Sequence, residues 1–342
     1  MSPQSILITG GAGYIGSICV ERLLAEGHTV TVVDNLSVGH RAAVASEAAF
    51  HQADIGDLAV LRAVFQKAQP KSILHFAGCA LVSESMEQPL KYFQNNTADA
   101  LNLLNCAAEF SVGKFIFSST CSTYGIPETI TITEAALQRP VNPYGESKRM
   151  FEQMLQWHAN QTGTEAVIFR YFNAAGATAK LGEHHDPETH LIPRILQTAL
   201  GRHKSVSIFG TEHPTPDGTC VRDYVHVSDL AEAHQLALRP GITGDYNLGR
   251  GHGDSVLEVL QACREITGHP IPTENHPARA GAPPPRSSPP WIKPANTSNG
   301  KPTTSPSPTL SPVPGDGIKP MLTATPSNMP VKPVDILSDS AQ

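Results

Sequence analysis

The fold is decided by "SILITGGAGYIGSICVERLLAEGHTVTVVD", residues 5–34. An apolar run typical of a buried strand ends in glycines, a stretch with helical spacing follows, and a second apolar run ends at Asp34. Gly10, Gly13 and Gly16 lie where glycines allow a tight turn and let backbone N–H groups approach a pyrophosphate. Asp34 can accept hydrogen bonds from a ribose diol and would repel a 2′-phosphate. This stretch therefore predicts binding of NAD rather than NADP.

The same alternation of strand and helix continues along the chain. Further strands are expected just before Asp54 and over 72–78, 114–120 and 165–173, and further helices over 89–110 and 143–160. Strands that alternate with helices predict an α/β fold with a doubly wound, Rossmann-like parallel sheet. The alternation weakens from Ala177, where long loops (182–193 and 210–223) predict a smaller second region over the strand ends.

Composition excludes several classes of protein. The chain has 342 residues, a formal net charge of −6 and no basic run, which argues against nucleic acid as a partner. No apolar stretch approaches ~20 residues, so neither a signal peptide nor a membrane span is expected. The six cysteines are scattered without a Cys-x-x-Cys pair, which is typical of reduced thiols in a cytoplasmic protein. We expect no metal site.

A candidate catalytic pair lies in "PYGESK", where Tyr144 and Lys148 are four residues apart and share one helix face. A free phenol has a pKa of about 10, and a neighbouring ammonium together with a cationic nicotinamide would lower it enough for the phenolate to act as a base. Thr120 closes the strand 114–120, so its hydroxyl either reaches a substrate oxygen at the strand end or forms a turn.

These stretches together resemble the extended short-chain dehydrogenase/reductase family, and within it the enzymes that invert C4 of UDP-sugars. The resemblance covers about residues 5–281 and rests on "ILITGGAGYIGS", "VVDNLS", "HFAG", "NPYGESK", "RYFNAAGA", "DPETHLIP" and, most specifically, "PTPDGTCVRDYVHV".

The resemblance implies reversible C4 epimerisation of UDP-glucose and UDP-galactose through a 4-keto intermediate, with tightly bound NAD. Tyr144 would take the proton of the 4-hydroxyl, Thr120 would hydrogen-bond the 4-oxygen, and Lys148 would hold the nicotinamide ribose. A homodimer through the helices 89–110 and 143–160 is also implied.

Further site residues follow from the resemblance, residue by residue. Those expected to contact NAD are Gly10, Gly13, Tyr14, Ile15, Gly16, Asp34, Asn35, Leu36, Asp54, Ile55, Phe76, Ala77, Gly78, Asn96, Lys148 and Tyr171. Those expected to contact the UDP-sugar, besides Thr120 and Tyr144, are Asn173, His190, Leu191, Ser207, Phe209, Arg222 and Arg279. Two alternatives stay open: Asp54 could instead cap a helix, and Arg222 could instead pair with Asp223.

The resemblance also suggests how the chain is divided. Residues 1–176, with a returning segment 221–250, would form the NAD-binding domain. Residues 177–220 and 251–281 would form the substrate-binding region. A proline-rich, disordered tail would occupy 282–342.

The tail departs from the family abruptly. Sixteen of the 29 prolines lie at or after Pro277, and Ala282 replaces the aspartate that the family has in Arg-x-Gly-Asp. A disordered linker and a proline-rich ligand for another domain are both possible interpretations. The genetic code favours a third: the codon of Trp291 and the first bases of the codon of Ile292 require Asp in the shifted frame. The junctions that follow permit "DKARQYLEW", "AWRWHQAH" and "AYGY", which resemble the family's C-terminus. We therefore expect a frameshift near Ala282.

Two other functions stay open. One is a different NAD-dependent nucleotide-sugar enzyme, such as a dehydratase, although these commonly have an acid directly after the threonine, where this chain has Cys121 and Ser122. The other is a catalytically impaired, NAD-binding product of a frameshifted gene.

Overall fold

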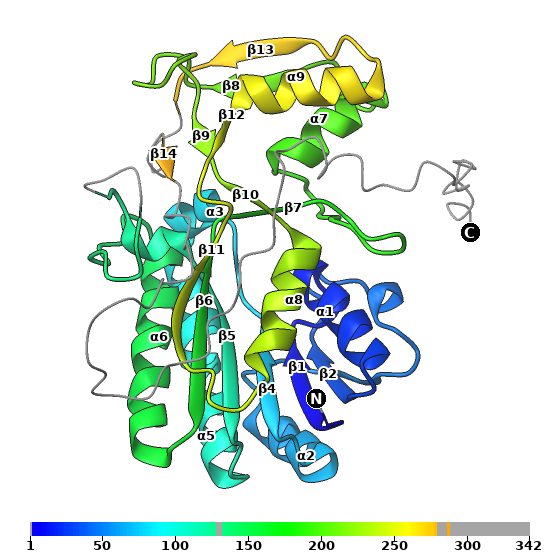
Figure 1. Ribbon diagram of the computed structural model, residues 1–342, viewed down its shortest axis with the longest axis vertical. Coiled ribbons are helices and arrows are strands. Elements are labelled where there is room, and N and C mark those ends of the chain that lie inside the picture. Colours follow the sequence, from blue (N-terminus) through cyan, green and yellow to red (C-terminus); the bar gives the residue numbers. More distant parts are fainter. Residues whose placement is uncertain (1, 128–131, 279–285, 288–342) are drawn as a thin grey trace, which may run out of the picture.

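The computed structural model describes residues 2–127, 132–278 and 286–287. Its centre is a sheet of seven parallel strands in the order β11-β6-β5-β4-β1-β2-β3 (Figure 1). The strands are β1 (Ser5–Thr9), β2 (Thr29–Asp34), β3 (Ala49–Gln52), β4 (Ser72–His75), β5 (Lys114–Thr120), β6 (Glu165–Tyr171) and β11 (Gly244–Leu248). The predicted doubly wound parallel sheet is confirmed, and β11 adds an edge strand that the sequence analysis did not name.

Helices cover both faces of the sheet because its strands are apolar on both sides. On β1, Ile6 and Ile8 point to one face and Leu7 to the other, and all three are fully buried. The face of Ile6 is covered by α1 (Tyr14–Ala25) and α8 (Val227–Ala237). The other face is covered by α2 (Leu58–Ala68), α5 (Leu101–Glu109) and α6 (Pro143–Thr162). Figure 1 shows α1 and α8 side by side, away from α5 and α6.

The single helix expected over 89–110 is interrupted. It forms α4 (Pro89–Phe93), a π-helical segment (Gln94–Asp99) and α5. The wider turn accompanies a polar residue turned inward, since Asn96 is buried and bonds to groups outside its own helix. Such π segments often occur at functional sites.

A second region lies beyond the carboxyl ends of the strands (Figure 1). It contains α7 (Leu191–Ala199), β8 (Val206–Phe209), β9 (Val221–Arg222), β12 (Asp254–Ser255), α9 (Val256–Thr267) and β13 (Thr273–His276). Its own core joins α7 and α9 through Ile195, Val259 and Cys263. The parallel pair β7 (Asn173–Ala175) and β10 (Tyr224–His226) connects it to the sheet.

Up to residue 278, three further short elements are η1 (Arg41–Ala43), α3 (Val82–Glu87) and η3 (Cys121–Tyr124). Within the described ranges, no helix has the length and apolarity needed to cross a bilayer.

Only two residues of the expected tail are described. Arg286 and Ser287 form β14, which pairs in parallel with Val221 and Arg222 of β9. At this point the chain is paired through its backbone rather than lying free. The remainder of the tail, with Ala282, lies outside the described residues.

Candidate active site

The predicted cofactor residues follow strands whose carboxyl ends meet at one edge of the sheet. The register pairs Thr9 with Val33 on β2 and with His75 on β4, and it pairs Thr120 with Tyr171. The strand order reverses between β1 and β4, where ligands of such sheets bind in a crevice. The residues that end or follow these strands therefore lie along one edge: Gly10, Asp34, Phe76, Ala77, Gly78 and Thr120.

The turn after β1 requires glycine at Gly10 and Gly16. Gly10 has a φ of 74°, and a Cβ there would lie 2.4 Å from the backbone nitrogen of Ala77. At Gly16 a Cβ would lie 2.2 Å from the carbonyl oxygen of Gly10. Gly13 is the N-cap residue of α1, and no side chain caps this helix. The turn thus presents the N-terminus of α1 to an anionic group, which the N–H groups and helix dipole would stabilise.

Asp34 ends β2 with its carboxylate fixed by backbone groups. Its Oδ2 accepts a hydrogen bond from Ala12 N at 2.9 Å, and its Oδ1 accepts one from Leu36 N at 2.8 Å. The neighbouring Asn35 donates to Asp54 Oδ2 at 2.8 Å, which brings two predicted NAD contacts together. Asp54 does not cap α2.

The cap of α2 is Asp57, whose side chain accepts from Val60 N at 3.0 Å. The helix-cap alternative for Asp54 is therefore wrong. Its carboxylate accepts from Gly56 N at 2.7 Å and so shapes the loop that follows β3.

Asn96 links the loop after β4 to α6. Its amide nitrogen donates to the carbonyl of Cys79 at 2.9 Å and to Ser147 Oγ at 3.0 Å, and its oxygen accepts from Cys79 N at 2.8 Å. A Cβ on Gly78 would lie 3.0 Å from Asn96 Oδ1 and 3.1 Å from Lys148 Nζ. The predicted NAD contacts Gly78, Asn96 and Lys148 therefore form one cluster.

The three candidate catalytic residues converge where β5 meets the start of α6. Asn142 caps α6 by accepting from Gly145 N at 2.8 Å, and Pro143 occupies the first turn, which fixes where the helix begins. Burial raises the pKa of the Tyr144 phenol to about 12, and a hydrogen bond with Thr120 opposes this rise. Thr120 Oγ1 also accepts from Ser122 N at 3.1 Å, so the threonine shapes the turn as well.

Lys148 is buried one turn further along α6. Its Nζ donates to the carbonyl of Ser118 at 3.0 Å and lies 4.9 Å from the centre of the Phe117 ring. Burial lowers the pKa of its ammonium to about 8. The lysine therefore sits under the carboxyl edge of the sheet, on the same side of α6 as Tyr144.

The remaining predicted cofactor residues form the walls of this edge. Tyr171 shares a hydrogen bond of 2.8 Å with His234, and Tyr14 donates to the carbonyl of Gly176 at 2.5 Å. Ile15 packs against α8, and Ile55 is buried beneath the other face of the sheet.

The predicted substrate residues fall into two groups. Asn173 lies near the sheet, because its backbone nitrogen and its side chain both donate to the carbonyl of Asp223 at 2.9 Å. Arg222 directly precedes Asp223. Burial raises the pKa of the Cys121 thiol, next to Thr120, to about 12, and the positive charge of the Arg222 guanidinium opposes this rise.

The second group lies in the second region. Ser207 and Phe209 belong to β8, which pairs with β13, and Figure 1 shows β8 well above the sheet. His190 is the N-cap residue of α7 and Leu191 begins that helix. Arg279 lies outside the described residues.

Comparison with known proteins identifies the family. A sequence model of the NAD dependent epimerase/dehydratase family matches residues 6–249. The chain belongs to this family. It is 50% identical over 288 residues to the UDP-glucose 4-epimerase of Streptococcus mutans, which covers 82% of this chain and 86% of that protein.

Solved structures of family members agree with the fold. The UDP-glucose 4-epimerase of Brucella ovis in complex with NAD superposes with a TM-score of 0.79 at 43% identity, covering 83% of this chain and 89% of the other. The enzyme from Bifidobacterium longum in complex with NAD⁺ and UDP gives 0.78 at 37% identity, covering 82% and 88%.

The epimerase/dehydratase site also depends on residues that the sequence analysis missed. Glu152, on α6, forms a buried ion pair with Arg170 on β6, and Ser119 beside Thr120 donates a hydrogen bond to the same carboxylate. Arg170 also donates to the hydroxyl of Tyr124 at 2.9 Å. The only sequence signal was the position of Glu152, four residues after Lys148 on the same helix face.

Asp223, considered from the sequence only as a possible ion-pair partner of Arg222, is the second such residue. Its carboxylate accepts from the backbone nitrogens of Arg250 and Gly251, both at 2.8 Å, and burial raises its pKa to about 7. It ties β10 to the loop after β11, and its full burial gave no signal in the sequence.

Proposed function

We propose that this protein interconverts UDP-glucose and UDP-galactose by inverting C4, with NAD as its resident cofactor. The observation that carries the proposal is the convergence of Thr120, Tyr144 and Lys148 at the carboxyl edge of the sheet, beside the glycine turn after β1. The family and its UDP-glucose 4-epimerase members support the same reaction.

The residues present fit NAD. The glycine cradle at Gly10 and Gly16 leaves no room for a Cβ, the N-terminus of α1 has no side-chain cap, and the Asp34 carboxylate is fixed at the end of β2. These groups would hold the pyrophosphate and the adenosine ribose, and Lys148 with Asn96 would hold the nicotinamide ribose. When bound, NAD supplies a ring that accepts a hydride from C4 and returns it.

Tyr144 would move the proton. With a pKa of about 12 its phenol is protonated in the protein alone, so it needs positive charge nearby before it can act as a base. The Lys148 ammonium is placed to supply part of that charge. Tyr144 would take the proton of the 4-hydroxyl as the C4–H bond breaks, which leaves a 4-keto sugar, and return the proton to O4 on reduction. Thr120 would donate a hydrogen bond to O4 throughout.

The product has the opposite configuration, so the keto sugar must present its other face before reduction. The UDP part must stay held while the hexose turns. We propose that Asn173 and Arg222 hold it near the sheet and that His190, Leu191, Ser207 and Phe209 hold it in the second region, with Arg279 contributing from outside the described residues. A guanidinium such as that of Arg222 suits a diphosphate because it binds oxyanions in a bidentate manner.

In domain terms, residues 1–176 and 221–250 would bind NAD, and residues 177–220 and 251–281 would bind the UDP-sugar. The core of the second region joins α7, β8 and α9 and supports this division; it also includes Ala175 and Tyr224, from β7 and β10, where the two regions meet.

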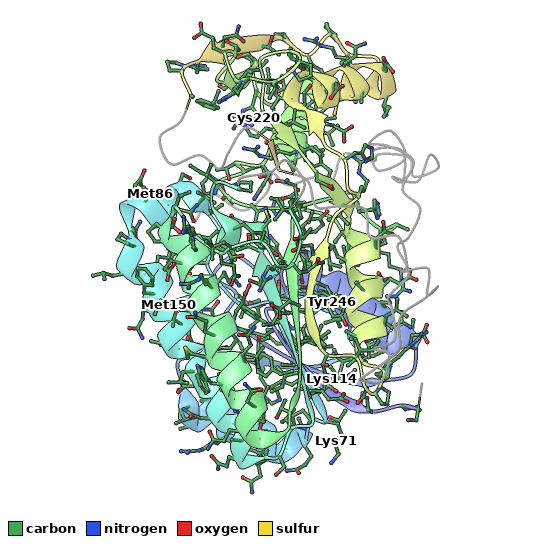
Figure 2. All side chains as sticks on the ribbon, turned by 60° about the vertical axis from the view of Figure 1, so that its left-hand side comes forward. Lys71, Met86, Lys114, Met150, Cys220 and Tyr246 are labelled. Carbon is green, nitrogen blue, oxygen red and sulfur yellow. The ribbon has the colours of Figure 1, made fainter. Side chains whose placement is uncertain are left out.

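The test is conversion of UDP-galactose to UDP-glucose, followed by chromatography. Tyr144→Phe should lower kcat by about 10²–10⁴-fold, the usual contribution of a general base, while bound NAD stays. Tyr246→Phe is the matched control: Tyr246 lies on β11 (Figure 2), and among the described residues its hydroxyl donates only to the carbonyl of Thr243, at 2.9 Å. Near-normal turnover by Tyr144→Phe would show that Tyr144 is not the general base.

The same assay separates the alternatives. A dehydratase would release a UDP-sugar lighter by one water, detectable by mass spectrometry, but Cys121 and Ser122 after Thr120 offer no acid for elimination. An impaired protein would retain NAD yet give no product even with Tyr144 intact.

We also propose a homodimer through α5 and α6. Trp157 on α6 is 76% exposed, and Leu101 on α5 is also exposed. Met150 lies on the same helix as Trp157 (Figure 2). A second copy of the chain would cover this apolar face. Trp157→Glu should yield monomers in light scattering, and Leu200→Glu, which alters an exposed leucine elsewhere, should not. If Trp157→Glu remained dimeric, the interface would lie elsewhere.

A cytoplasmic location is supported by the cysteines. All six are free, and three of them (Cys19, Cys106 and Cys263) are buried, which is typical of a reducing compartment.

A further inference from the structure

Four potential metal ligands meet in the loop that leads into α7. Their ligand atoms come from Glu183, His185, Glu188 and His190, and all lie within 4.8 Å of one another. His190 Nδ1 lies 3.1 Å from Glu183 Oε1 and 3.0 Å from Glu188 Oε1. His185 Nδ1 lies 3.5 Å from Glu183 Oε1 and 3.7 Å from Glu188 Oε2. Each imidazole therefore faces both carboxylates.

These separations match the edges of a tetrahedral site. Zinc binds imidazole nitrogen and carboxylate oxygen at about 2.0–2.2 Å, so two ligand atoms of a regular tetrahedron lie about 3.3–3.6 Å apart. The four nitrogen–oxygen separations, from 3.0 to 3.7 Å, cluster around that value.

Burial of the carboxylates without a cation is the second observation. The side chains of Glu183 and Glu188 are 12% and 5% exposed, and among the described residues their only ion-pair partners are the two histidines. Two carboxylates held close in a poorly solvated place are costly unless positive charge offsets them.

One of the two histidines that face these carboxylates, His185, has a ring nitrogen without a hydrogen bond to any described residue. His185 Nδ1 is buried and has no hydrogen-bond partner in the described part of the chain. Hydrogen bonding alone explains only half of the cluster: Glu188 caps the approach to α7 by accepting from Thr189 N and His190 N, both at 2.8 Å. It does not explain why Glu183 and His185 Nδ1 point at the same centre.

We propose that Glu183, His185, Glu188 and His190 bind one Zn²⁺ ion. Two imidazoles with two carboxylates favour zinc over calcium and magnesium, which prefer oxygen ligands alone. Four protein ligands leave no open position, so the ion is structural and takes no part in the chemistry at C4. It joins the loop after β7 to the start of α7 and fixes His190 through Nδ1, which leaves Nε2 available to other groups.

The experiment uses the full chain without an affinity tag, stripped with a chelator and titrated with Zn²⁺ by calorimetry. We expect one strongly bound Zn²⁺ per chain and a rise in Tm on binding. His185→Gln should weaken zinc binding by at least ~100-fold, because loss of a residue that merely hydrogen-bonds a metal ligand already costs up to about 100-fold. It should also abolish the rise in Tm. Co²⁺ in the same site should give the intense visible absorption of a tetrahedral complex.

His184→Gln is the matched control. His184 is adjacent to His185 but faces His40, with 2.9 Å between their ring nitrogens, so it tests for adventitious binding by an exposed histidine pair. Zinc binding that follows His184 rather than His185 would overturn the proposal, as would the absence of a strong site in the wild type. If His185→Gln does not fold, Glu183→Gln replaces it with the same expected loss. Neither outcome depends on epimerase activity.

Discussion

Glu152→Gln is the sharpest test of how the catalytic helix is held. Tyr144, Lys148 and Glu152 recur every fourth residue on the sheet-facing side of α6, so the charge of Glu152 anchors the same face that carries the catalytic groups. Its carboxylate is 1% exposed and meets Arg170 with Nε–Oε1 and Nη2–Oε2 distances of 3.1 and 2.7 Å. Glutamine keeps the shape and removes the charge.

The expected loss of folding stability depends on which contacts Arg170 retains. Removing one partner of a buried ion pair typically costs 3–5 kcal/mol, because the other charge is left buried. Arg170 Nη2 retains a contact of 2.7 Å with Asp245, which is partly exposed and therefore offsets only part of the loss. We expect the free energy of unfolding to fall by about 3 kcal/mol.

Urea denaturation measures this loss, with Glu146→Gln as the control on the same helix. Glu146 pairs with Arg149 at 3.2 Å near the surface, so its substitution should cost less than about 1 kcal/mol. In Glu152→Gln kcat should also fall, since the hydroxyl of Ser119 loses its charged acceptor beside Thr120. A loss no larger than that of Glu146→Gln would refute the view that this pair holds α6 on the sheet.

Three further outcomes are expected. Gly10→Ala should lower the free energy of unfolding by about 2–4 kcal/mol and abolish NAD binding, because its Cβ would lie 2.4 Å from Ala77 N at a φ of 74°; urea denaturation and NAD content check this. Lys148→Met should stabilise the NAD-free protein by about 2 kcal/mol at pH 7, because burial lowers the pKa of the lysine from 10.5 to about 8 in the folded protein. The advantage of the variant should shrink as pH rises above 8, since the wild type then loses the buried charge and gains stability. Denaturation at several pH values would show no such trend if Lys148 were solvated. Replacing the residues after 281 by the translation of the shifted frame should raise UDP-glucose affinity and Tm. If the replaced protein and the original gave equal values, the frameshift interpretation would be wrong and the tail would be part of a functional protein.

The sequence was enough for the sheet because its strands are buried on both faces. The run SILIT (residues 5–9) is followed by a glycine turn, and KFIFSST (residues 114–120) has an apolar centre, so local patterns located both strands. The strand β11 (GDYNL) lies at the sheet edge and carries polar residues, which removed that signal. The π-helical segment at Asn96 depends on Cys79 and Ser147, which lie far from it in the sequence.

The site residues also fall into those that local patterns predict and those that they do not. Tyr144, Lys148 and Thr120 belong to a helix start and a strand end, and local patterns locate both. The Glu152–Arg170 pair and Asp223 act through long-range contacts, and no local pattern distinguishes them from surface charges. The cluster in residues 183–190 did have a visible spacing of acids and histidines, but only the folded loop brings their ligand atoms together.

The path of the chain between its two regions limits how the protein can be divided. The chain passes into the second region after β7, returns through β10, α8 and β11, and leaves the sheet again after Leu248. No single cut separates the two regions, so truncating the gene at residue 176 would strip α8 and β11 from the sheet and expose Ile6 and Val167. Ala175 and Tyr224 lie at opposite ends of neighbouring parallel strands of three residues each. A linker of roughly five residues would span the ~8 Å between them. An isolated cofactor-binding half should therefore lack residues 176–223 and stop near residue 250, so that α8 and β11 remain on the sheet.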